Sequence, residues 1–128
     1  MSGLSSGPSG GDDRDMRLTL PLPPSANAYW RAVRGRVLLS AVARQYKDTC
    51  ALAAAAQWKG GPLEGRISLH GEFYMDGRGD LDNRLKVLLD SLQGWAFYND
   101  SQIWELRAVR HHVKREHRVE IEITEMAA

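Results

Sequence analysis

Hydrophobic and polar residues alternate with the two-residue period of a β-strand in several short stretches of the chain. In residues 67–74 the odd positions are hydrophobic or glycine and the even positions are more polar. Residues 119–124 alternate in the same way, so that one side of the strand is predicted to face the core. Residues 16–20 form another short strand, which the prolines at positions 21, 23 and 24 end because proline cannot sit inside a central strand.

Two longer stretches repeat their hydrophobic positions every three or four residues, which predicts α-helices. The first runs from residue 40 to about residue 58, with Ser40 as its N-cap and the Gly-Gly-Pro of residues 60–62 as its end. The second runs from residue 82 to residue 93 and ends at Gly94. The predicted buried faces are Val42, Tyr46, Cys50 and Ala53 in the first helix and Leu85, Leu88, Leu89 and Leu92 in the second.

The order of the elements predicts the fold class. Residues 29–39 are predicted to form a ribbon that turns at Gly35, and residues 103–113 and 119–124 to close the chain as a hairpin around residues 114–116. We therefore expect a small single α+β domain with a mixed, largely antiparallel sheet and two main helices. It spans residues 16–128, after a disordered tail, residues 1–15, that is rich in Ser, Gly and Asp.

Composition narrows the functional classes. No hydrophobic run approaches the roughly 18 residues that a membrane span needs, and the first residues do not resemble a signal peptide. The single cysteine, Cys50, excludes an internal disulfide and a multi-cysteine zinc site, and we interpret it as a small core residue. We therefore expect a cytoplasmic protein without a membrane partner or an organic cofactor.

The net charge of +1 hides an uneven distribution. The first fifteen residues hold three aspartates and one arginine, so the remainder has a net charge of +3. Four carboxylates of that remainder fall between Asp80 and Asp100. If these bind a divalent cation, the rest of the surface is distinctly basic, as expected of a protein that binds nucleic acid.

The acidic residues of this stretch form the candidate chemical site. Asp82, Lys86 and Asp90 recur at every fourth position of the second helix, Asp80 lies just before it, and Asp100 follows after a short link. A strand, a tight loop and a helix start are predicted to bring several of these carboxylates around one point. Mg²⁺ prefers such oxygen ligands, and in a nuclease it activates water and relieves charge repulsion at the phosphate.

The spacing alone leaves a plainer interpretation equally open. Asp80 or Asp82 can cap the helix, since a helix N-terminus favours negative charge. Lys86 can form ordinary surface ion pairs with Asp82 and Asp90 at the i, i+4 spacing. An Asp-x-Asp pair is common, so the pattern by itself does not distinguish these alternatives.

Two separated motifs resemble the RusA family of Holliday junction resolvases. Residues 23–31, Pro-Pro-Ser-Ala-Asn-Ala-Tyr-Trp-Arg, are similar to that family's proline-rich entry motif. Residues 80–103, with Asp-Leu-Asp-Asn at 80–83, Leu-Asp-Ser-Leu around Asp90 and Asn-Asp-Ser-Gln-Ile at 99–103, are similar to its active-site segment. The resemblance covers roughly residues 17–126 and implies a junction-cutting endonuclease.

The resemblance implies a role for each matching residue. Asp80, Asp82 and Asp100 correspond to the metal-binding acids and Lys86 to the catalytic lysine, while Asp90 matches an acidic position that supports the metal site. It also implies dependence on Mg²⁺, for which Mn²⁺ is a candidate substitute, a homodimer, and symmetric nicking of four-way DNA junctions in recombination and repair, often in phages.

The sequence departs from the family pattern at two places, one in a loop expected to bind DNA and one beside the metal-binding acid Asp100. The loop before Asp80 is often densely basic in the family but offers only Arg78 here, and position 99 is Asn where a second acid often stands. We expect DNA contacts mainly from the ribbon after the proline motif, since arginines bind phosphates and aromatic rings stack on bases. The candidate DNA-binding residues are Asn27, Tyr29, Arg31, Arg34, Arg36 and Arg78.

The many basic residues near the end of the chain have two possible explanations. The basic side chains of residues 107–118 are as compatible with a solvated turn as with DNA contact.

A four-way junction is resolved only when two opposed strands are cut, so one acidic cluster per chain predicts a two-fold dimer. Some aromatics are candidates for its interface, but we assign Trp104 to the monomer core. The alternative functions are a less selective branched-DNA nuclease and a module that binds branched DNA without cutting it.

Overall fold

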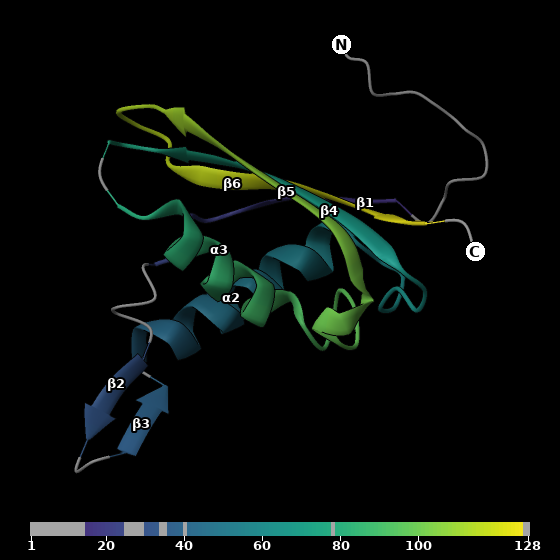
Figure 1. The fold of residues 1–128 in the computed structure, drawn as a ribbon, viewed down its shortest axis with the longest axis horizontal. Helices are drawn as coiled ribbons and strands as arrows, with labels where there is room; N and C mark the ends of the chain where they lie inside the picture. Colours follow the sequence, from purple (N-terminus) through teal and green to yellow (C-terminus); the bar gives the residue numbers. More distant parts are fainter. Residues whose placement is uncertain (1–14, 25–29, 34–35, 40, 78, 127–128) are drawn as a thin grey trace.

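The computed structural model describes residues 15–24, 30–33, 36–39, 41–77 and 79–126 (Figure 1). Within these ranges no helix is long and apolar enough to cross a membrane. The elements are β1 (Met16–Leu20), β2 (Trp30–Val33), β3 (Arg36–Leu39), α2 (Ala41–Gln57), β4 (Ile67–Met75), α3 (Leu81–Leu92), the short 3₁₀-helix η2 (Asp100–Gln102), β5 (Ile103–His112) and β6 (Arg118–Glu125). The predicted α+β class is confirmed.

A four-stranded mixed sheet organises the domain. Its strand order is β1-β6-β4-β5. The β1–β6 and β6–β4 pairs are antiparallel, whereas β4 and β5 are parallel and are connected through α3. The short strands β2 and β3 pair antiparallel in a separate ribbon, as predicted, which extends away from the sheet beyond α2 (Figure 1).

The predicted hairpin of the last two strands is wrong. Both strands exist, but β4 lies between them, so that β6 and β5 occupy opposite sides of β4. The physical reason is the crossover through α3, which returns the chain to the start of β4 and makes β5 parallel to it. The alternating pattern of residues 119–124 predicted correctly which face of β6 is buried but carries no information on its neighbours.

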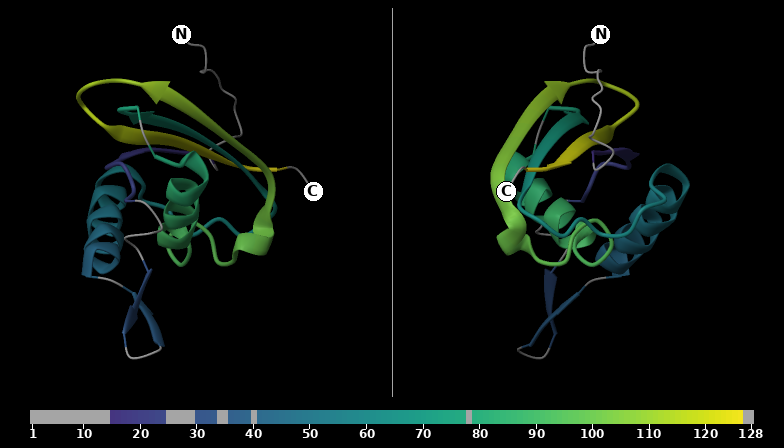
Figure 2. Two further views of the ribbon diagram at one scale, coloured as in Figure 1. Left: turned by 60° about the vertical axis from the view of Figure 1, so that its left-hand side comes forward. Right: turned by 90° about the vertical axis from the view of Figure 1, so that its right-hand side faces the viewer.

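Both helices cover the same face of the sheet (Figure 2). The strand side chains that face them form the core, and every second residue of β4 from Ile67 to Met75 is buried there. The largest fully buried side chains are Phe73, Phe97, Met16, Leu20, Leu63, Ile67, Leu69, Met75, Leu88, Leu92 and Ile123. The opposite face of the sheet carries polar, half-buried side chains and has no layer of the described chain over it.

The helix boundaries agree with the prediction to within a residue or two, but the buried faces are rotated slightly. In α2 the buried residues include Ala54 in place of the predicted Ala53, which is half-buried. In α3 the fully buried residues are Val87, Leu88, Ser91 and Leu92, while the predicted Leu85 and Leu89 are half-buried. Gly94 follows α3 with a φ of 106°, a left-handed conformation that glycine adopts without strain. Ser40 and the side chain of Val42 lie outside the described residues.

Candidate active site

The first turn of α3 carries two of the predicted acids. Asp80 is the N-cap, with an extended backbone, and its Oδ1 accepts a hydrogen bond from the backbone N–H of Asp82 at 3.3 Å. Its Oδ2 accepts another from Nδ2 of Asn83 at 3.1 Å. Capping, one of the two interpretations that the spacing left open, is therefore realised by Asp80. Each carboxylate oxygen of Asp80 accepts one hydrogen bond in this arrangement and keeps a further lone pair for another ligand.

Asp82 and Lys86 lie on the exposed side of α3. They are four residues apart, one helical turn, yet no ion pair joins them in the described structure. An exposed carboxylate without a cationic partner is free to bind a metal ion or a substrate. Lys86 adds a positive charge beside the acids of this turn.

Two arginines brace the approach to α3. Gly79, which precedes the N-cap, has a φ of 105°, and its carbonyl accepts a hydrogen bond from the Arg110 guanidinium of β5. Arg84 donates from Nη1 to the carbonyl of Pro23 at 2.6 Å. The proline segment, the end of β5 and the start of α3 therefore meet at one end of the domain.

Asp100 stands at the start of η2, and a capping box fixes the backbone there. Asn99 Oδ1 accepts from the Ser101 N–H at 2.9 Å, and Gln102 Oε1 accepts from the Asn99 N–H at 3.0 Å. The other end of the Gln102 amide donates to the carbonyls of Leu63 and Gly65, at 3.0 Å and 2.8 Å. The sequence interpretation missed Gln102, although Asn followed by Gln three residues later has the spacing of a capping box. The Asp100 side chain itself is exposed.

The structure does not bring Asp100 to Asp80 and Asp82 within one chain. Asp100 precedes the first residue of β5, whereas the start of α3 is held at the far end of β5 by Arg110. Ten residues of strand separate these ends, roughly 30 Å. Among the described residues, no group of three or more His, Cys, Asp or Glu side chains is placed to hold a metal ion. The predicted convergence of the acids around one point is therefore wrong for a single chain.

Asp90 lies two turns further along α3 and faces α2. Its Oδ2 is 3.9 Å from Lys47 Nζ, with both side chains about two-fifths exposed. Such a half-exposed ion pair contributes little to stability. Asp90 thus has a structural partner between the helices, about 12 Å along the helix axis from Asp82.

Comparison with known proteins determines the family. The family model described as Endodeoxyribonuclease RusA matches residues 21–124, which include the proline segment, all of α3 and Asp100. The chain belongs to the RusA family. Its relatives named crossover junction endodeoxyribonuclease include those of Enterobacteria phage 82 and Escherichia coli K12, each 36% identical over 112 residues. The relative from Shigella sonnei is 35% identical, and each alignment covers 85% of this chain and 93% of the relative.

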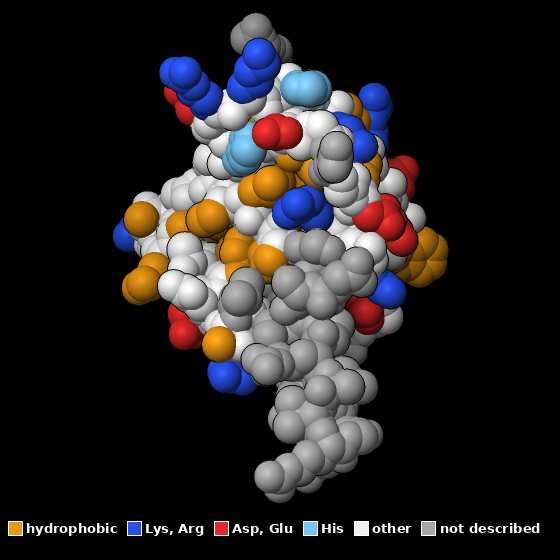
Figure 3. Space-filling model, turned by 90° about the vertical axis from the view of Figure 1, so that its left-hand side faces the viewer, with side chains coloured by type: hydrophobic (Ala, Val, Ile, Leu, Met, Phe, Trp, Pro, Cys, Tyr) orange, Lys and Arg blue, Asp and Glu red, His pale blue; other side chains and the backbone are white. Residues whose placement is uncertain are grey.

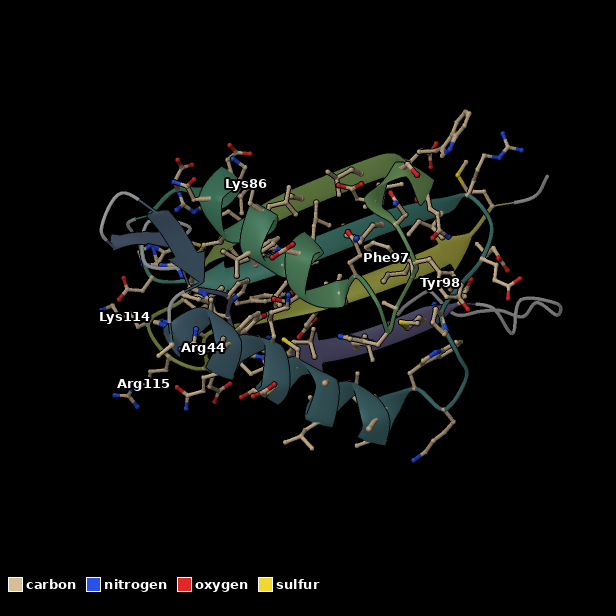
Figure 4. All side chains as sticks on the ribbon, turned by 90° about the horizontal axis from the view of Figure 1, so that it is seen from below. Arg44, Lys86, Phe97, Tyr98, Lys114 and Arg115 are labelled. Atoms are coloured by element: carbon tan, nitrogen blue, oxygen red, sulfur yellow. The ribbon has the colours of Figure 1, made fainter. Side chains whose placement is uncertain are left out.

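The candidate DNA-binding residues of this RusA-family chain cannot be placed at the level of their side chains. Residues 25–29, 34 and 78 lie outside the described residues, as do the side chains of Arg31 and Arg36. Other basic residues are placed. Lys86 of α3 and Lys114 and Arg115 of the β5–β6 turn lie toward one end of the molecule, together with Arg44 (Figure 4). Viewed from that end, Lys and Arg side chains project beside histidines at the top of the molecule (Figure 3).

A second polar cluster lies on the face of the sheet that no helix covers. The Glu72 carboxylate contacts the Nε2 atoms of both His70 and His111, the former at 2.6 Å. The hydrogen bond from His111 is the main cause that lowers the pKa of Glu72. The His111 ring stacks on Tyr74 with centroids 4.5 Å apart, and the Arg118 guanidinium lies over the same tyrosine. These contacts link β4, β5 and β6, so we interpret the cluster as structural.

Cys50 is not a nucleophile in this fold. Its side chain is fully buried in α2, and this burial raises the pKa of the thiol to about 11. A thiol with this pKa is protonated at neutral pH and lacks the thiolate that attacks substrates. The interpretation of Cys50 as a core residue is confirmed.

Gln102→Ala is expected to lower the free energy of unfolding by about 1–3 kcal/mol, because four hydrogen bonds of one amide side chain are lost. Urea titration followed by circular dichroism measures this change. Gln45→Ala, on the exposed side of α2, is the matched control and should change stability by less than about 0.5 kcal/mol. Equal stability of the two variants would show that the capping box does not hold η2.

Proposed function

We propose that this chain is a metal-dependent endonuclease that resolves four-way DNA junctions as a homodimer. The observation that carries the proposal is the set of exposed acids, Asp80, Asp82 and Asp100, on a chain of the RusA family. Each subunit would cut one of two opposed strands, which a single chain with one set of acids cannot do symmetrically. We expect it to act in the cytoplasm of a bacterium or a phage-infected cell, where its DNA substrate lies.

The donor atoms of these acids suit Mg²⁺. They are carboxylate oxygens, none of the three acids makes an ion pair in the described chain, and hard cations prefer such ligands. When bound, the cation lowers the pKa of a coordinated water and reduces the negative charge on the phosphate. Mn²⁺, of similar ligand preference, is expected to substitute for Mg²⁺.

The separation of the acids indicates that each catalytic centre takes residues from both subunits. Asp80 and Asp82 stand at the end of β5 where α3 begins, and Asp100 stands at the opposite end. A two-fold axis near the middle of β5, perpendicular to the strand, exchanges these two ends. We therefore propose that Asp80 and Asp82 of one subunit act with Asp100 of the partner subunit, so that the dimer holds two complete centres.

Lys86 and Asp90, the other two residues of the candidate site on α3, have different tasks. We assign Lys86, which is exposed one turn after Asp82, the task of stabilising negative charge that develops on the phosphate oxygens. Asp90, already paired with Lys47, supports the packing of α3 against α2. The reaction adds water across one P–O bond and leaves a nick with a phosphate and a hydroxyl end.

The basic end of the molecule suits contacts with the duplex arms of a DNA junction. Lys114 and Arg115 are exposed on the β5–β6 turn, toward the end where α3 begins. Phosphate contacts of this kind position a duplex without reading its sequence. We assign Asn27, Tyr29, Arg31, Arg34, Arg36 and Arg78 the same task, with Tyr29 stacking on bases near the junction centre.

Incubation with a synthetic four-way junction, end-labelled on each strand in turn, tests the proposal. With Mg²⁺ we expect paired nicks at symmetry-related positions, and with EDTA none. Duplex, forked and single-stranded DNA of the same sequences are the controls and should remain intact. Cutting of every substrate would instead show a less selective nuclease. A gel shift without cutting would show a module that binds DNA but does not cut it.

A further inference from the structure

Two arginines from different elements meet at Gly79, the residue before Asp80. Arg110 of β5 donates a hydrogen bond from Nη2 to the Gly79 carbonyl. The guanidinium of Arg84 on α3 packs against the same glycine, because a Cβ atom built on Gly79 would lie 3.4 Å from its Nη2 and 3.5 Å from its Nε. The backbone just before the candidate metal-binding acids is thus flanked by two positive charges.

Neither of these charges is balanced by an acid of the same chain. In the described part of the chain no ion pair includes Arg84 or Arg110. Arg84 is half-buried, donates only to the neutral carbonyl of Pro23, and has a buried Nε that finds no hydrogen-bond partner among the described residues. It also lies in the first turn of α3, where the helix dipole disfavours a cation and favours an anion. An anion beside Gly79 would therefore stabilise this arrangement.

We propose that Arg110 binds a backbone phosphate of the junction strand, within one or two nucleotides of the phosphate that is cut. The inference rests on the proposed function, which makes DNA the substrate and Asp80 a metal-binding acid, and it adds a residue that positions the strand. Gly79 and Asp80 are neighbours with Cα atoms about 3.8 Å apart, so a phosphate held beside Gly79 lies close to the metal site.

The side chain of Arg110 suits this contact. A guanidinium has five N–H donors, and Arg110 uses one of them on Gly79. The side chain is exposed, so its other donors are open to a ligand from solvent. The bond to Gly79 already orients the planar group, which reduces the side-chain entropy that is lost when a phosphate binds.

Occupation of the metal site is expected to strengthen the contact. Asp80 and Asp82 repel a phosphate and offset the charge of the two arginines over a longer distance. A divalent cation neutralises these carboxylates, and the positive charge of Arg84 and Arg110 then acts on the DNA without opposition. Junction affinity should therefore depend on Arg110 more strongly in Ca²⁺ than in EDTA.

Replacement of single phosphates by uncharged methylphosphonates tests the contact. The nick made by the parent in Mg²⁺ gives the reference position, and binding is then titrated in Ca²⁺ with one replacement at each position within two nucleotides of it. In the parent, one replacement should weaken binding roughly tenfold or more, because a hydrogen bond between two charged groups is lost. Arg110→Gln should bind the unmodified junction about as weakly, and the same replacement should then cost it less than about threefold.

The choice of variants separates a phosphate contact from bracing of the loop. The glutamine amide keeps an N–H that can donate to Gly79 but carries no charge, whereas Arg110→Lys keeps the charge and should bind within about fivefold of the parent. The slope of log affinity against log salt concentration should fall by roughly 0.7–0.9 in Arg110→Gln, as expected for one lost phosphate contact. Arg17→Gln is the matched control, since it removes an exposed arginine from β1 at the opposite edge of the sheet, and it should change neither affinity nor slope.

The outcomes distinguish this inference from the proposed function. A parent that cuts no junction would refute the proposed function. A parent that cuts, while Arg110→Gln binds as the parent does or loses as much as the parent at every replaced phosphate, would refute the phosphate contact alone.

Discussion

Asp80→Asn is expected to abolish junction cleavage, by roughly a thousandfold or more, while leaving junction binding almost unchanged. The amide has the same shape as the carboxylate, and its oxygen still accepts the capping hydrogen bond from the Asp82 N–H. The helix therefore keeps its first turn, but the site loses a negative charge that binds the metal ion. Single-turnover cleavage and a gel-shift titration in Ca²⁺ measure the two properties separately.

Asp100→Asn is expected to give the same loss of cleavage, although Asp100 lies at the other end of the crossover that connects β4 to β5 through α3. Asp76→Asn is the matched control, because it removes one exposed carboxylate from the loop between β4 and α3 without touching the proposed site. It should cleave within about threefold of the parent. Full cleavage by both the Asp80 and the Asp100 variants would refute the metal-site assignment.

The helical part of the candidate site could be predicted from the sequence. Asp82 and Lys86 are one turn apart on a helix whose hydrophobic period is clear, so their common exposed side follows from local geometry. The position of Asp80 at the helix start follows from its capping preference. These features depend only on residues close in sequence.

The place of Asp100 could not be predicted in the same way. It depends on whether β5 runs parallel or antiparallel to its neighbour, and the alternation of side chains is the same in both cases. The assumption of a closing hairpin hid the parallel crossover that carries Asp100 away from Asp80. The many exposed positions of β5 were the available signal, since a strand at the edge of a sheet is less buried than a central one.

The exposure of Trp104 shows a second limit of sequence interpretation. A tryptophan in a strand is usually assigned to the core, because it buries a large hydrophobic area. Here its ring lies outside, with the Arg66 guanidinium 4.8 Å from its centroid. The position of β5 at the edge of the sheet explains why this large side chain is exposed.

The most direct test of a centre shared between subunits mixes the two inactive variants in one dimer. Asp80→Asn and Asp100→Asn subunits are co-expressed with different affinity tags, and the heterodimer is isolated through both tags. If each centre takes Asp80 from one subunit and Asp100 from the other, one centre of this heterodimer carries both substitutions and the second carries neither.

If the centres are shared between subunits, the heterodimer regains nicking of one junction strand, at a rate close to half that of the parent, but does not make paired cuts. Each homodimer of a single variant, prepared in parallel, should stay inactive. A heterodimer as inactive as the two homodimers would contradict shared centres, because it would mean that all three acids of a centre come from the same chain.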